Sequence, residues 1–178
     1  IPDYTAALQG EDGQACEDGS CEPETQVEAR TDFAQCARGS GKDCGHLPAI
    51  GASEWLNALG EPHGTVTLVD FWSSSCVNCA REIPEIERIY EKYKDAGLVV
   101  IGVHSPQQAH ERDASVVSGA ASRLGITYPV AVDSDLTTWR NFDNHYWPAH
   151  YLADSKGELR QVKFGEGGEA TTERLSLI

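Results

Sequence analysis

Short apolar runs alternate with longer amphipathic segments over most of this chain. Val66–Trp72 and Leu98–His104 contain too few polar residues to face water, and this predicts strands in the interior of a sheet. Between them, Cys76–Lys94 places isoleucine and tyrosine side chains at helical intervals, which predicts an amphipathic helix. We expect a kink at Pro84, because proline lacks a backbone N–H and crowds the preceding turn.

The same alternation continues through the second half of the chain. The further predicted elements are a helix at Gln107–Leu124 closed by Gly125, a strand at Pro129–Val132, a short helix near Leu136–Phe142, a strand beginning at Tyr151–Leu152, a hairpin turn at Asp154–Gly157 and a strand at Leu159–Phe164. A short helix at Glu54–Leu59, capped by Ser53, is expected before the first strand. Strands that alternate with helices and end in a hairpin predict an α/β sandwich with a mixed sheet.

The first 45 residues differ in composition from the rest. They carry ten acidic and three basic residues. Their net charge is therefore −7, half of the formal charge of −14 for the whole chain. Because they are rich in glycine and poor in apolar residues, they cannot alone bury enough surface to offset the entropy lost on ordering. The sequence therefore predicts an acidic, Gly- and Cys-rich N-terminal extension at residues 1–45 and a folded domain at 46–178.

Charge and hydropathy exclude some classes of function. The negative charge argues against nucleic acid and anionic membranes as partners. No apolar run approaches the roughly 20 residues that a membrane-spanning helix needs. The chain has no methionine, not even at position 1, and no visible signal peptide. We therefore expect a mature or excised piece whose targeting segment lies outside it.

Four of the six cysteines lie in the extension, at Cys16, Cys21, Cys36 and Cys44. An even number in such a segment predicts disulfides formed in an oxidising compartment. Three pairings are available, and we favour Cys16–Cys21 with Cys36–Cys44 because near neighbours close short loops. The alternative is a four-cysteine zinc site, with His46 as a further candidate ligand. The spacing lacks the C-x2-C knuckles typical of such sites, so we predict no metal.

The other two cysteines form the motif Cys76-Val77-Asn78-Cys79, where the first long strand gives way to the helix. A helix N-terminus offers free N–H groups and a partial positive charge, which favour the thiolate that attacks in disulfide exchange. Cys76, at the exposed start of the helix, is the expected attacking thiolate. Cys79, one turn deeper, is the expected resolving thiol. The motif therefore predicts a redox-active dithiol rather than half of a zinc knuckle, since no second C-x2-C exists.

With its neighbours, this motif resembles the thioredoxin superfamily. Val69–Trp72, Cys76–Cys79 and Arg81–Pro84 are most similar to the extracytoplasmic TlpA and ResA branch, where E-x-P follows CxxC. Further segments, among them Leu98–His104 and Tyr146–Ala149, resemble the thioredoxin-like domain of DipZ-type cytochrome c biogenesis proteins. The resemblance covers about residues 47–175. It implies a thioredoxin-like three-layer sandwich, a mixed central sheet flanked by helices, after an irregular Cys-rich extension.

The resemblance also implies roles for residues around the dithiol. Asp70 matches a buried aspartate that helps to deprotonate the resolving thiol, and Glu82 matches the E-x-P glutamate that modulates both thiols. Pro148 matches the cis-proline that faces the dithiol and lets the preceding backbone pair with a bound chain. The residues expected to contact the partner are Trp72, Val77, Asn78 and Trp147.

Each of these residues also has a plainer interpretation. Asp70 could be a hydrated strand-end carboxylate, Glu82 a solvated helix-face residue and Pro148 a trans proline. Trp72 could simply pack in the core. Having both acids is unusual, so one of them could be redundant. The histidines at 145 and 150, which flank Pro148, are expected to be structural.

The sequence thus predicts a thiol–disulfide oxidoreductase, needing no cofactor, that acts in the periplasm, in the cell envelope or as a secreted protein. Val77-Asn78 contains neither the proline of reducing thioredoxins nor the histidine of strong oxidants, so the residues leave the direction open. The resemblance favours a reductant of partner proteins, recharged by a membrane electron donor of the DipZ or CcdA type.

Four alternatives remain open at this stage. The first is a disulfide-forming oxidant. The second is a peroxiredoxin-like peroxidase, disfavoured because no Pro-x3-Thr/Ser-x2-Cys arrangement precedes Cys76. The third is a non-catalytic binding module with a thioredoxin-like fold. In the fourth, the cysteines of the extension exchange with Cys76 as an internal relay.

Overall fold

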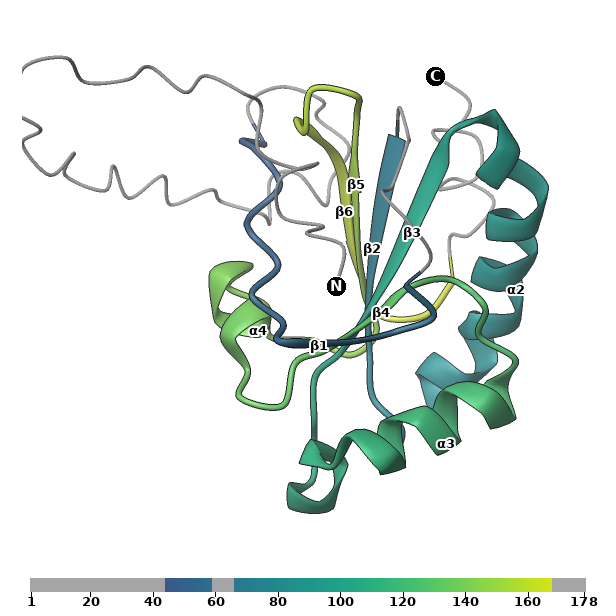
Figure 1. Ribbon diagram of the computed structural model, residues 1–178. Helices are drawn as coiled ribbons and strands as arrows, with labels where there is room; N and C mark the ends of the chain where they lie inside the picture. The colour runs from purple at the N-terminus through teal and green to yellow at the C-terminus, as the bar shows by residue number, and fades with distance from the viewer. Residues whose placement is uncertain (1–43, 59–65, 168–178) are drawn as a thin grey trace, which may run out of the picture.

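A computed structural model describes residues 44–58 and 66–167 of the chain. Within them, six strands form one mixed sheet in the order β1-β4-β3-β2-β5-β6 (Figure 1). The strands are β1 (Glu54–Leu56), β2 (Val66–Trp72), β3 (Leu98–His104), β4 (Val130–Val132), β5 (Ala149–Ala153) and β6 (Leu159–Phe164). β2, β3 and β4 run parallel to one another, while β1, β5 and β6 pair antiparallel with their neighbours.

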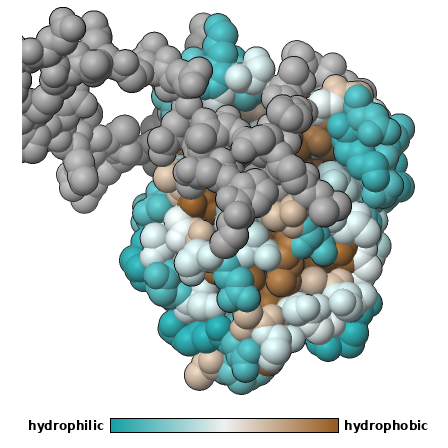
Figure 2. Space-filling view, in the orientation of Figure 1, coloured by the Kyte–Doolittle hydropathy of each residue, from teal (hydrophilic) through white to brown (hydrophobic). Residues whose placement is uncertain are grey.

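Helices cover both faces of this sheet. The helical elements are α2 (Val77–Tyr93), η1 (Lys94–Ala96), η2 (Ala109–Arg112), α3 (Ala114–Leu124) and α4 (Thr137–Asn141). α2 and α3 lie on one face and α4 lies on the other (Figure 1). The outer side of α2 is hydrophilic (Figure 2), in keeping with its amphipathic sequence. The predicted thioredoxin-like three-layer sandwich is confirmed for the described residues.

Strand β2 shows why the sheet needs both layers. Leu68 and Trp72 pack in the cluster beneath α2 and α3, whereas Val69 and Phe71 pack in the cluster beneath α4. Side chains alternate between the faces of a strand, so Asp70 points to the same side as Leu68 and Trp72. Its carboxyl group therefore lies beneath α2, and this position determines much of the site described below.

The predicted helix at Glu54–Leu59 is wrong. Glu54–Leu56 forms strand β1, which pairs antiparallel with the edge of β4. Asn57 then adopts a left-handed conformation with φ 53°, and its side-chain amide donates to the carbonyls of Ile126 and Tyr128 at 3.0 and 3.3 Å. Pairing with a distant strand edge has outweighed the local helical pattern.

The predicted helix at Gln107–Leu124 is correct only in its second part. The 3-10 turn η2 comes first, and α3 begins after Asp113, whose carboxylate caps it by accepting from the Ser115 N–H at 2.8 Å. Gly125 closes α3 in a left-handed conformation, as predicted. The interruption places the buried Glu111 in η2 rather than in a continuous helix.

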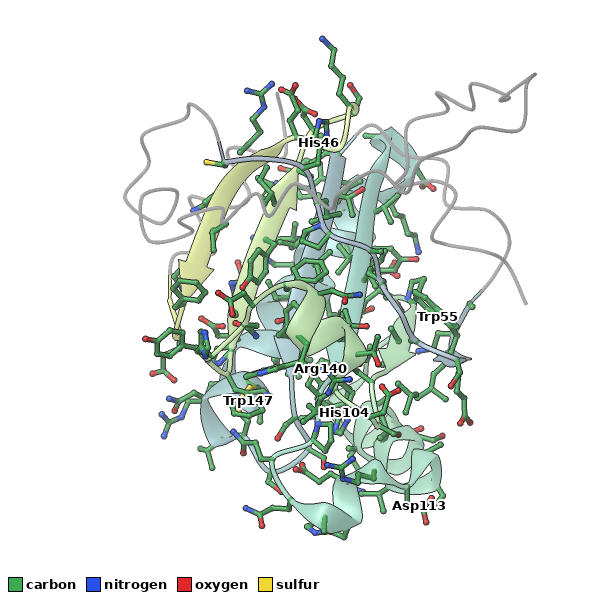
Figure 3. The ribbon with its side chains drawn as sticks, turned by 90° about the vertical axis from the view of Figure 1, so that its left-hand side faces the viewer. His46, Trp55, His104, Asp113, Arg140 and Trp147 are labelled. Carbon is green, nitrogen blue, oxygen red and sulfur yellow. A yellow bond between two sulfur atoms is a disulfide. The ribbon has the colours of Figure 1, made fainter. Side chains whose placement is uncertain are left out.

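The remaining predicted elements are confirmed to within a few residues. α2 continues past Pro84, and β5 and β6 form the expected hairpin. The chain enters the domain beside this hairpin, where His46 bridges to Glu158 (Figure 3). No helix in the described part of the chain is long and apolar enough to cross a bilayer.

Cys44 is buried and disulfide-bonded. The other three cysteines of the extension, Cys16, Cys21 and Cys36, lie outside the described residues. Their pairing, and the boundary between the extension and the domain, therefore stay predictions. Within residues 44–58 and 66–167 no cluster of His, Cys, Asp and Glu could hold a metal ion.

Candidate active site

Cys76 and Cys79 form a disulfide at the start of α2, with their Cα atoms 5.2 Å apart. Cys76 is the N-cap residue, and its sulfur accepts from the Cys79 N–H at 3.1 Å. Cys76 is 8% exposed and Cys79 is 1% exposed, so Cys76 is the sulfur nearer to the surface. The neighbouring Val77 is 65% exposed. The closed dithiol thus lies at a helix N-terminus with both cysteines buried, and Cys76, which was expected to be exposed, is only the less buried of the two.

Asp70 is buried directly beneath α2, being only 2% exposed. The Tyr128 hydroxyl lies 3.4 Å from its Oδ2 and donates to it. Burial, reinforced by the charge of Asp70, raises the pKa of Tyr128 well above its usual value, so Tyr128 stays protonated. Asp70 is therefore not a hydrated strand-end residue. Its catalytic role stays a prediction.

Glu82 is likewise buried, although the helix surface around it is polar. Its Oε1 accepts from the Gly167 N–H and lies 3.5 Å from the Lys163 ammonium. Its Oε2 lies 3.4 Å from His150 Nε2, and the same nitrogen lies 3.2 Å from Asp70 Oδ1. The two acids that looked redundant in the sequence are therefore joined through one histidine, which the sequence analysis had set aside.

The Trp147–Pro148 peptide bond is cis, as the resemblance implied. Pro148 leads directly into β5, which pairs with β2. The Trp147 indole stacks on Trp139 at 4.0 Å, and its Nε1 donates to the Ser105 carbonyl at 2.9 Å. Trp147 also packs against the apolar cluster that contains both cysteines. The loop before β5 is thus anchored by its tryptophan to Trp139, to the Ser105 carbonyl and to the apolar cluster that includes the two cysteines.

The other predicted partner-contacting residues differ in exposure. Trp72 is fully buried and packs edge-on against His104, with ring centroids 4.7 Å apart. Asn78 is exposed on the first turn of α2, where its Oδ1 lies 3.4 Å from an Arg81 nitrogen that donates to it. Contact of either side chain with a partner stays a prediction.

Glu111 is the main residue of the site that the sequence analysis missed. Its fully buried carboxylate holds the three serines that precede Cys76. Oε1 accepts from the Ser73 hydroxyl at 3.1 Å, the Ser74 hydroxyl at 2.6 Å and the Ser75 N–H at 2.8 Å. Oε2 accepts from the N–H groups of Gln107 and Gln108, each at 2.7 Å. One carboxylate thereby fixes the backbone that leads into the nucleophile.

The protonation states of Glu111 and His104 suit these contacts. Burial opposes ionisation of Glu111, but the hydrogen bonds from Ser74, Gln107, Gln108 and Ser75 outweigh it and lower its pKa to about 2. Burial lowers the pKa of His104 to about 4, so its imidazole is neutral at pH 7. Its Nε2 can therefore accept from the Ser74 N–H, 3.1 Å away. His104 and Trp147 lie toward the same end of the sheet (Figure 3).

A closed Cys-x-x-Cys pair at a helix N-terminus, together with a cis-proline that leads into a strand of the same sheet, defines a thiol–disulfide oxidoreductase of the thioredoxin type. Comparison with known proteins agrees. The AhpC/TSA family matches residues 55–162, and the chain belongs to that family.

Individual relatives include named thiol-disulfide oxidoreductases and solved structures with the same fold. Thiol-disulfide oxidoreductase YkuV of Bacillus subtilis is 34% identical, over 70% of this chain and 86% of its own length. A thiol-disulfide isomerase structure from Corynebacterium glutamicum superposes with a TM-score of 0.66 at 26% identity, covering 74% of this chain and 92% of that one.

The protein DipZ of Mycobacterium tuberculosis is 42% identical over 98% of this chain. This chain spans only 27% of the length of DipZ. The resemblance to thioredoxin-like oxidoreductases is thus confirmed.

Proposed function

We propose that this chain reduces disulfides in partner proteins outside the cytoplasm. The observation that carries the direction is the ionised Glu111 carboxylate, which accepts from the N–H of the residue directly before Cys76. A negative charge at this position opposes the Cys76 thiolate. Dithiols become strong oxidants when their reduced form is stabilised, so destabilising the thiolate favours reduction of the partner.

The reaction follows from the arrangement of the two sulfurs. The Cys76 thiolate attacks one sulfur of the partner disulfide, forms a mixed disulfide and releases the other partner sulfur as a thiolate. Cys79 then loses its proton and attacks the Cys76 sulfur, which closes the Cys76–Cys79 disulfide and releases the second partner sulfur as a thiolate. Asp70, buried beneath the same helix, is the proposed proton acceptor for Cys79.

The region around Pro148 is the proposed docking site for the partner. An extended partner segment would pair with the backbone before Pro148, next to the fixed Trp147 side chain. The exposed Val77 would supply an apolar contact beside the reacting sulfur.

The proposed location and electron source follow from the wider resemblance. An even number of cysteines in the N-terminal extension suits an oxidising compartment. Since the chain is similar to part of DipZ and that resemblance implies a membrane electron donor, we propose that a donor of that type recharges the dithiol.

The reduction potential tests the direction. Equilibration with glutathione or dithiothreitol buffers should give a value near roughly −270 mV, whereas a value near roughly −120 mV would show an oxidant. Cys79→Ser should accumulate a mixed disulfide with a disulfide-bearing protein, and Cys76→Ser is the matched control that should trap none. Rapid peroxide consumption by the reduced protein would instead support a peroxidase.

A further inference from the structure

Three polar residues form a row across the sheet, directly beneath α2. Asp70 on β2 is paired with His150 on β5, and His150 is paired with Lys163 on β6. Leu152, two residues after His150, packs in the cluster on the α2 side of the sheet. Since residues two apart share a face of a strand, this row points toward α2.

Glu82 of α2 closes over the row from above. It reaches both His150 and Lys163, at 3.4 and 3.5 Å, while His150 reaches Asp70 at 3.2 Å. The exposed fraction of the side chains rises along the row, from 3% for Asp70 and His150 and 5% for Glu82 to 21% for Lys163. The four groups therefore connect the buried Asp70 to the surface of the domain.

The charges of these groups show why the histidine matters. Two carboxylates and one ammonium leave a single negative charge, which a proton on His150 neutralises. Two ionised carboxylates in a buried site repel each other strongly, and the imidazole that lies between them is placed to bridge them. One nitrogen, Nε2, faces both carboxylates.

We propose that His150 is a positioning residue that joins Asp70 and Glu82 into one proton-sharing unit serving Cys79. This inference rests on the proposed role of Asp70 as proton acceptor for the resolving thiol. As Cys79 attacks Cys76, its proton moves to Asp70. Asp70 passes a proton to His150 Nε2, and His150 passes one to Glu82 beside the more exposed Lys163. No electrons are exchanged in these transfers.

His150→Gln removes the shared imidazole while keeping a polar side chain. It should slow resolution of the mixed disulfide at pH 7 by about a hundredfold, the lower end of the range for general acid–base assistance. Formation of the mixed disulfide by Cys76 should stay within about twofold, because that step does not use the Cys79 proton. His145→Gln is the matched control, since His145 flanks the same proline but is 69% exposed.

The pH profile separates this role from a merely structural one. The groups facing His150 are Asp70 from β2, Glu82 from α2 and Lys163 from β6, with the Tyr128 hydroxyl on the far side of Asp70. In His150→Gln the resolution rate should recover as pH rises and Cys79 ionises without help. A structural defect would instead slow both steps at every pH.

Glu82→Gln provides a second test that does not depend on the histidine variant folding. It should shift the pH profile in the same direction, and adding it to His150→Gln should change little more, because both act through one unit. A wild-type resolution rate and pH profile in either folded variant would refute the proposal.

The Cβ chemical shift of Cys79 in the reduced protein reports its titration without any partner. His150→Gln should move that titration even if the measured potential shows wild type to be an oxidant. Failure of the proposed reductive direction is thereby distinguished from failure of the proton-sharing unit, which an unmoved Cys79 titration would contradict.

Discussion

Replacing Glu111 with glutamine should destabilise the domain more than any other change of one carboxylate to its amide near the dithiol. The carboxylate of Glu111 accepts three hydrogen bonds on Oε1 and two on Oε2. Glutamine keeps one oxygen and presents an NH2 group where the other was. The less costly orientation turns the NH2 group toward the Gln107 and Gln108 N–H groups, which then lose their acceptor.

Two separate arguments give the size of the effect. An unsatisfied buried N–H costs about 1–3 kcal/mol, so losing two acceptors costs about 2–6 kcal/mol. Lowering the pKa of Glu111 from 4.5 to about 2 corresponds to a preference for the ionised form in the folded state of about 3 kcal/mol. We therefore expect Glu111→Gln to lower the free energy of unfolding by about 3 kcal/mol at pH 7.

The dependence on pH has a definite sign. Because folding depresses the pKa of Glu111, its contribution to stability is complete above pH 4.5 and is lost as pH falls toward about 2. The difference in stability between wild type and Glu111→Gln should therefore be constant from pH 7 to 5 and shrink below 4.5.

Urea unfolding followed by tryptophan fluorescence measures both effects. Glu85→Gln is the control, since Glu85 makes an exposed ion pair with Arg88, and such pairs contribute little. If Glu111→Gln unfolds within about 0.5 kcal/mol of wild type at pH 7, a value typical of surface substitutions, the anchoring role is refuted. The variant should also raise the reduction potential, because it removes the charge that opposes the Cys76 thiolate.

Further predictions concern the neighbours of the site. The pKa of His104 is about 4, so as pH falls the unfolded chain binds a proton at this histidine before the folded chain does. The free energy of unfolding should therefore fall by about 3 kcal/mol between pH 6.5 and 4. His104→Gln, which keeps a hydrogen-bond acceptor, should weaken this dependence of stability on pH, as measured by urea unfolding. Gly102→Ala should lower the free energy of unfolding by about 1–3 kcal/mol, because the added Cβ would lie 2.9 Å from the Tyr128 ring. Gly119→Ala in α3 should instead raise it by about 0.5–1 kcal/mol, and thermal unfolding measures both variants. Trp147→Ala should raise KM for a protein disulfide by about tenfold while reaction with dithiothreitol changes little, and equal losses with both would contradict a docking role.

The sequence predicted best the parts of the fold that are coded locally. The helix at Val77–Tyr93 and the strand at Val66–Trp72 have periodic or continuous apolar patterns, and the dithiol at the start of the helix has a fixed spacing. Strand β1 has only three residues, too few to show a period of two, and its partner β4 lies far along the chain. A short strand of this kind is determined by the edge it pairs with, so its own residues suggested a helix.

The buried charges of the site could not be predicted in the same way, because sheet register brings their partners together. Asp70 and Glu82 were found by resemblance, but only the pairing of β2 with β5 places His150 between them. The three serines before Cys76 carried a signal that was not used. Two of their hydroxyls and one N–H point to Glu111, so consecutive small donors before a helix cap should prompt a search for a buried acceptor. Here the acceptor lies in the segment that follows the neighbouring strand. Glu111 belongs to η2, the next element after β3, and β3 lies beside β2 in the sheet.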